Sequence, residues 1–204
     1  MLNTMAGKYG ADAAIAGMSV VTRISMFASS VIIGFGQGFQ PVCAFCFGAK
    51  RYSRVREAYF FCLKVATVIM LILSALAFGF SERIVTAFRA DDPEVIAIGT
   101  LALQLQLCTL PTWGLVVMSS MLTQSIGDGL RSTIISISRQ GIFLIPLLLI
   151  LPPMLGLLGL QIAQPAGDVF AFILSILLVR NLMAKMKQAA DGEPLQLLPG
   201  KKGA

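Results

Sequence analysis

Residues 160–179, with the sequence LQIAQPAGDVFAFILSILLV, decide the fold class of this chain. They form an almost unbroken apolar run, and about 20 such residues are the length a helix needs to cross the hydrocarbon core of a bilayer. Four more runs of this kind precede it, covering approximately residues 13–41, 58–80, 95–123 and 132–151. We therefore predict an all-α polytopic membrane protein with five transmembrane helices.

The composition of the whole chain excludes a soluble fold. Of its 204 residues, 56% are hydrophobic and only 13% are charged, whereas a soluble domain has about 25% charged residues. The formal net charge of +6 does not indicate a nucleic-acid partner, because the basic residues lie in short loops and a tail beside the apolar runs. They instead report the orientation in the lipid bilayer, since cytoplasmic loops of membrane proteins are rich in Lys and Arg.

The basic residues gather after the first, third and fifth apolar runs, which places them on one side of the membrane. They are Lys50, Arg51, Arg54 and Arg56, then Arg131, and then Arg180, Lys185, Lys187, Lys201 and Lys202. We predict that this side is the cytoplasm, so that the C-terminus is cytoplasmic and the N-terminus faces outward. Residues 1–184 are then the transmembrane part, and residues 185–204 are expected to be a disordered, basic cytoplasmic tail.

Polar residues in the last apolar run are candidates for a functional site, because ionisable groups at membrane depth are costly. Gln161, Gln164 and Asp168 lie at positions i, i+3 and i+7, which form one face of a helix. Pro165 should free a backbone carbonyl inside this stripe. Asp168 is either a proton or cation site, or it neutralises Arg23, which we expect at the same depth, or it bonds to a neighbouring helix.

Two other runs carry polar residues that could line a cavity. In the third run, Gln106, Thr109 and Trp113 share a helical face. That face suits the wall of a cavity for a flat cationic drug, through hydrogen bonds and cation–π attraction; packing between helices is the alternative. In the fourth run, Arg139 is a candidate cation-site or cavity-lining residue, and its alternative is to snorkel to the inner headgroups.

The sequence contains no recognisable motif of an enzyme or of a cofactor site. It has no His, which removes a Ser-His-Asp set and makes a zinc site improbable. Cys43 and Cys46 form a single C-x-x-C without a second pair, and they lie near the cytoplasmic end of the first run, where thiols stay reduced. A Walker loop is also absent, so we predict no enzyme, no resident cofactor, no metal site and no ATP-driven transport.

Several stretches carry a family resemblance. Residues 34–41 (GFGQGFQP) are followed by residues 48–55 (GAKRYSRV), and residues 138–146 (SRQGIFLIP) and 159–168 (GLQIAQPAGD) come later in the chain. In this order they resemble the eighth helix and its following loop, the eleventh helix and the start of the twelfth helix of MATE (multidrug and toxic compound extrusion) transporters. The likeness is to the MepA-like bacterial branch.

The resemblance implies a fold of twelve helices in two bundles of six, in which the five predicted helices correspond to helices 8–12. It implies that Met1–Tyr9 is the end of the seventh helix, so that the chain is an incomplete C-terminal lobe that lacks the N-terminal lobe. The implied activity is export of cationic lipophilic drugs in exchange for Na⁺ or H⁺, by alternating access across the bacterial cytoplasmic (inner) membrane.

The sequence departs from the family pattern where a coupling site is concerned. Ala44 and Cys46 stand where we expect Gly and Asn, and the third run lacks the acid that some family branches use for coupling. The resemblance therefore assigns no coupling residue here, and Asp168 is a candidate from its position and chemistry. The alternative function is a membrane remnant or partner subunit that assembles with another lobe and transports nothing by itself.

Overall fold

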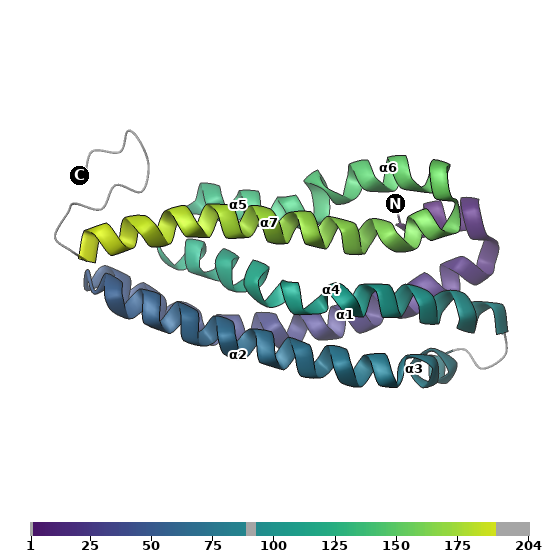
Figure 1. The fold of residues 1–204 in the computed structure, drawn as a ribbon, viewed down its shortest axis with the longest axis horizontal. Coiled ribbons are helices and arrows are strands. Elements are labelled where there is room, and N and C mark those ends of the chain that lie inside the picture. Colours follow the sequence, from purple (N-terminus) through teal and green to yellow (C-terminus); the bar gives the residue numbers. More distant parts are fainter. Residues whose placement is uncertain (1, 89–92, 191–204) are drawn as a thin grey trace.

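The computed structural model describes the backbone of residues 2–88 and 93–190, and all regular elements in these ranges are helices (Figure 1). They are α1 (Leu2–Gly48), α2 (Tyr52–Gly79), α3 (Ser81–Phe88), α4 (Pro93–Ser125), α5 (Gly129–Ile137), the π-helical turn η1 (Ser138–Ile142), α6 (Leu144–Leu155) and α7 (Leu157–Ala190). The all-α fold class is confirmed.

Four segments are long and apolar enough to cross a membrane. They are Ile15–Gly48 of α1, Tyr52–Gly79, Val95–Ser125 of α4 and Leu158–Ala190 of α7. The chain is therefore a multi-pass membrane protein. The fourth predicted run, residues 132–151, differs from the prediction because it is divided among α5, η1 and α6, and α6 alone is a shorter apolar helix. Pro146 has no N–H to bond the Ile142 carbonyl, which favours this break.

Helix α4 is the centre of the bundle. Figure 1 shows it between α7 and α2, and its largest contacts are with α1, α2 and α7. Its side chains Leu107, Trp113 and Met118 are almost completely buried in the hydrophobic core. Tyr59 of α2 is also buried there, and its hydroxyl lies 3.1 Å from the hydroxyl of Ser119. The residues of α4 can therefore contact several helices at once.

A proline inside α4 creates a free carbonyl that a neighbouring helix satisfies. Pro111 has no N–H, so the carbonyl of Leu107 lacks its usual partner four residues later. The Ser74 hydroxyl of α2 donates to that carbonyl over 2.6 Å. Since an unpaired carbonyl is costly away from water, this bond compensates for the proline and ties α2 to α4.

Glycines allow α1 and α4 to approach each other closely. A Cβ added to Gly17 would lie 3.1 Å from the backbone nitrogen of Gly99, and one added to Gly99 would lie 3.4 Å from the Gly17 Cα. Small residues at such crossings let helices in membranes pack backbone against backbone. The crossing therefore fixes the distance between these two helices near the start of α4.

Tight turns connect the later helices. Gly127 has a φ of 76° just before α5, and Asp128 caps that helix by accepting a hydrogen bond from the Arg131 backbone N–H over 3.3 Å. Gly156, with a φ of 59°, joins α6 to α7. These conformations suit glycine because it has no Cβ. The turn at Gly156 packs α6 against α7, and η1 also lies against α7.

The helix boundaries extend past those expected at both ends. Residues 2–9, expected at the end of a preceding helix, belong to the single helix α1. Helix α7 continues to Ala190, so residues 185–190 of the expected basic tail are helical. The rest of that tail, residues 191–204, lies outside the described residues.

Candidate functional site

The Asp168 carboxylate is the centre of a polar cluster inside the bundle. Asp168 lies on α7 and is only 3% exposed. Its Oδ2 accepts a hydrogen bond from Gln106 Nε2 over 2.7 Å, and its Oδ1 accepts one from Arg139 Nε over 3.0 Å. A buried carboxylate needs such partners because desolvation penalises its charge. Three separate segments, α4, η1 and α7, therefore meet at this one side chain.

The π-helical turn brings Arg139 to this position. In η1 the Phe143 N–H bonds to the Ser138 carbonyl, five residues earlier, over 3.1 Å. Such a turn inserts one extra residue into a helix, and π-turns of this kind occur often at functional sites. The extra residue changes the direction of the side chains around it, and Arg139 faces Asp168 of α7.

The guanidinium of Arg139 also stacks on an aromatic ring. Its Cζ lies 3.6 Å from the centroid of the Trp113 ring, a cation–π arrangement that is stronger in a desolvated site. Trp113 is seven residues after Gln106 on α4, so both residues lie on the face toward Asp168 and Arg139. The cluster of Asp168, Arg139, Gln106 and Trp113 thus contains one negative and one positive charge, and we call it the Asp168 cluster.

A cavity of about 260 Å³ lies against the Asp168 cluster. Arg139 lines it together with residues of α1, α4 and α5, among them Ser120, Met121, Gln124 and Ser136. The Ser120 and Ser136 hydroxyls lie 3.1 Å apart. Arg139 therefore contacts both the cavity and the Asp168 carboxylate.

The structure brings together some of the predicted site residues and separates others. Thr109 donates to the Gln106 backbone carbonyl over 3.0 Å, and Gln161 donates to the Ile98 carbonyl over 3.2 Å. Gln164 is half-buried on α7. Arg23 is exposed on α1 and is not the partner of Asp168.

The cavity contains one of the predicted site residues. Arg139 lines it, whereas Gln106 and Trp113 are buried at 2% and 1% exposure and are not among its lining residues. Gln124 and Ser120 were not predicted to belong to the site. Their spacing of four residues on α4 was the available signal, since such residues share a helical face.

Among the side chains that the structure describes, no three from His, Cys, Asp or Glu lie close enough together to hold a metal ion. Cys43 is buried and Cys46 is half-buried in α1, and both are free thiols. The Asp168 cluster is therefore the best-defined polar site of the described bundle.

Comparison with known proteins places the chain in a family. A family model described as MatE matches residues 1–150. The chain belongs to the MatE family. Among curated relatives, "Multidrug export protein MepA" of Staphylococcus haemolyticus (strain JCSC1435) is 24% identical over 186 residues, which are 91% of this chain and 40% of that protein. The protein of the same name from Staphylococcus aureus (strain NCTC 8325 / PS 47) is 26% identical over 196 residues, which are 94% of this chain and 43% of that protein.

Solved structures of MATE transporters share the fold of this MatE chain. An outward-facing MATE family transporter of the MOP superfamily superposes with a TM-score of 0.85 at 24% identity, covering 92% of this chain and 42% of that one. An inward-facing MATE family transporter also superposes with a TM-score of 0.85 at 24% identity, covering 92% of this chain and 43% of that one. This MatE chain thus spans about two fifths of the length of the relatives that it matches.

Proposed function

We propose that this chain is the C-terminal part of a secondary active multidrug efflux transporter. In this proposal it exports lipophilic cations in exchange for Na⁺ or H⁺, and a complementary N-terminal lobe supplies the rest of the pathway. The observation that carries the proposal is the contact of Arg139 with both the buried Asp168 carboxylate and the cavity. MatE family membership and the names of the multidrug export relatives support it.

The Asp168 cluster would couple the ion to the drug through charge. A proton or Na⁺ that reaches Asp168 neutralises the carboxylate and weakens its bond to Arg139. The guanidinium then keeps its positive charge beside the cavity without compensation, and it repels a bound cationic drug. When the ion leaves, the ion pair re-forms and the cavity wall becomes neutral again. Ion and drug therefore oppose each other's binding, and this opposition must be reciprocal, as exchange requires.

Alternating access would move the bundle against the complementary lobe. The equal TM-scores for outward-facing and inward-facing transporters support a bundle that keeps its internal packing in both states. We further propose that the membrane is the bacterial cytoplasmic membrane and that the C-terminus is cytoplasmic, because the basic residues lie in the loops and tail assigned to that side.

Ethidium efflux tests this function. Cells express the chain alone, the complementary N-terminal part of the S. aureus MepA relative alone, or both together. We expect efflux above background only when both parts are present, and we expect Asp168→Asn to abolish it when the variant and the wild type are compared at matched abundance in the membrane. Glu57→Gln, which removes an exposed carboxylate of α2, is the matched control and should keep full efflux.

Two results would contradict the proposal. Efflux that survives Asp168→Asn would remove Asp168 from coupling while leaving transport itself intact. A complete lack of efflux with both parts present and assembled would instead favour the alternative, a membrane remnant or partner subunit that does not transport. Co-purification of the two parts decides whether they are assembled.

A further inference from the structure

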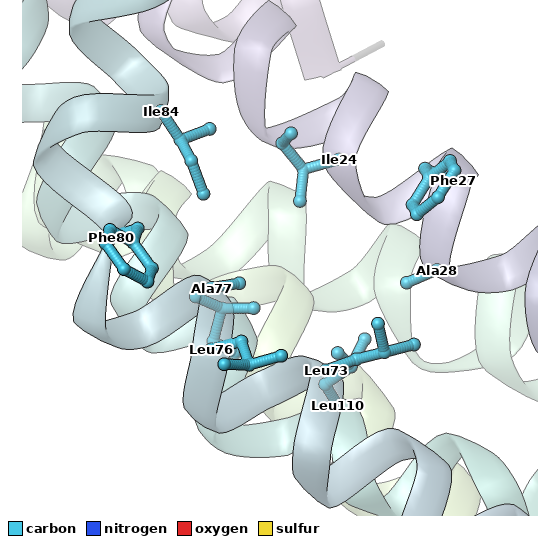
Figure 2. Close-up of a pocket in the computed structure, with 10 residues that line it drawn as sticks. Ile24, Phe27, Ala28, Leu73, Leu76, Ala77, Phe80, Ile84 and Leu110 are labelled. Carbon is cyan, nitrogen blue, oxygen red and sulfur yellow. The ribbon is translucent and has the colours of Figure 1, made fainter.

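An apolar crevice on the outside of the bundle has a composition unlike that of the Asp168 cluster. It has a volume of about 420 Å³ and lies among α1, α2, α3 and α4 (Figure 2). All of its lining residues are hydrophobic. Phe27, Leu76 and Phe80 on its wall are at least half exposed, so the crevice opens toward the surroundings of the helices. Its volume lies within the range of about 300–1,000 Å³ of sites for small organic ligands.

Two arginines are next to lining residues of this crevice in the sequence. Figure 2 shows Ile24 of α1 and Ile84 of α3 at the same end, away from Leu73 and Leu110. Arg23 and Arg83 directly precede these two isoleucines in the sequence. Both arginine side chains are exposed, and within the described part of the chain neither forms an ion pair.

Helical spacing and one ring contact relate the two arginines to opposite walls of the crevice. Arg23 lies one helical turn before Phe27, at position i relative to i+4, so the two side chains share a face of α1. Arg83 lies against the other wall, since its Cζ is 5.8 Å from the centroid of the Phe80 ring. Phe27 and Phe80 both line the crevice, and long arginine side chains can extend from an apolar wall toward headgroups.

We propose that this crevice is a binding site for one anionic phospholipid. An acyl chain fills the hydrocarbon-lined crevice, and the phosphate lies between Arg23 and Arg83, where planar guanidinium groups can hold it by two parallel hydrogen bonds each. The charge at the rim argues against a cationic drug as the occupant, because two guanidinium groups would repel it. The site is independent of the proposed transport at the Asp168 cluster.

Native mass spectrometry of the purified chain in micelles tests the lipid site. The probes are phosphatidylglycerol and phosphatidylcholine with the same acyl chains, added at equal concentration. We expect phosphatidylglycerol to be retained at least about tenfold more strongly than phosphatidylcholine, as each factor of ten needs only about 1.4 kcal/mol of preference. The double variant Arg23→Gln/Arg83→Gln should lose this preference. Arg180→Gln, an exposed arginine on α7, is the matched control and should keep it.

A second variant tests the acyl chain. Ala77→Phe places a ring inside the crevice and should reduce binding of both lipids, with the helical content checked by circular dichroism. Inorganic phosphate should not displace the lipid, because it brings no acyl chain.

Four outcomes would overturn the proposal. They are equal retention of the two lipids, an unchanged preference in the double arginine variant, displacement by phosphate alone, or a dimer without bound lipid that Ala77→Phe dissociates. Because the arginine variants leave the crevice walls unaltered, they decide the matter even if Ala77→Phe fails to fold.

Discussion

Arg139 Nε donates a hydrogen bond to Asp168 Oδ1 over 3.0 Å, and this bond joins the π-helical turn η1 to helix α7. The side chain of Asp168 is 4% exposed and that of Arg139 is 17% exposed. The pair is therefore largely withdrawn from water, and its partners Gln106 and Trp113 come from α4. Loss of one member leaves the other member's charge in a poorly solvated place, which leads to the first prediction.

Arg139→Gln should destabilise the bundle more than the double variant Arg139→Gln/Asp168→Asn. The single variant leaves a buried carboxylate without its cation, and breaking a buried ion pair in this way costs about 3–5 kcal/mol. The double variant removes both charges, so it should recover part of the stability that the single variant loses. Thermal unfolding in micelles, followed by circular dichroism, compares four proteins: the wild type, Arg139→Gln, Asp168→Asn and the double variant.

The result that would count against this prediction is additivity. If the two single substitutions simply add in the double variant, then the two side chains are not coupled. Arg180→Gln, which removes an exposed arginine of the same α7 helix, is the control and should change the unfolding temperature little.

Ser74→Ala should destabilise the chain much more when Pro111 is present than when it is replaced. The Ser74 hydroxyl bonds the Leu107 carbonyl, which Pro111 leaves without a backbone partner. Removing the hydroxyl costs about 1–3 kcal/mol because the carbonyl is then unpaired. In a Pro111→Ala background the N–H of residue 111 can bond that carbonyl, and the same substitution should cost much less. The unfolding temperatures of the four proteins give the comparison.

Thr67→Ala is the matched control for the serine prediction. The Thr67 hydroxyl also bonds a carbonyl, that of Leu63, but within the same helix. The backbone N–H four residues later already serves that carbonyl, so the loss of the hydroxyl should be small. If Ser74→Ala lowers the unfolding temperature equally with and without Pro111, then the Ser74 hydroxyl does not compensate for the proline.

Gly17→Ala and Gly34→Ala should have opposite effects, although both lie in α1. A Cβ at residue 17 would press on the Gly99 backbone at 3.1 Å, which cannot rotate away, whereas a Cβ at residue 34 meets nothing within 4 Å. We expect Gly17→Ala to lower the free energy of unfolding by about 1–3 kcal/mol, as at other overpacked sites. We expect Gly34→Ala to raise the free energy of unfolding by up to about 1 kcal/mol, because alanine has the better helix propensity. Equal unfolding temperatures for the two variants would refute the close crossing of α1 and α4.

The sequence was sufficient to predict the fold class, because apolar runs of bilayer length report membrane helices directly. The division of the run 132–151 was not predicted. A π-turn depends on a backbone register that tertiary contacts select. The apolar residues on both sides of Ser138–Ile142 are therefore read from the sequence as one continuous helix.

The sequence indicates which residues belong to the candidate site, but it does not indicate which of them contact each other. Asp168, Arg139, Gln106 and Trp113 stood out because polar side chains are rare at membrane depth. Sequence spacing relates residues within one helix only, so the partner of Asp168 could not be derived from it. Depth alone suggested Arg23, but the packing of η1 against α7 brings Arg139 to the carboxylate instead.

The most direct test of the coupling role of Asp168 is gradient-driven drug uptake into everted membrane vesicles. The vesicles contain the chain together with its complementary lobe, either as wild type or with Asp168→Asn, at matched abundance. We expect a Na⁺ or H⁺ gradient to drive accumulation of ethidium in wild-type vesicles and to drive none in the Asp168→Asn vesicles. Gradient-driven accumulation that is equal in the two preparations would contradict the account.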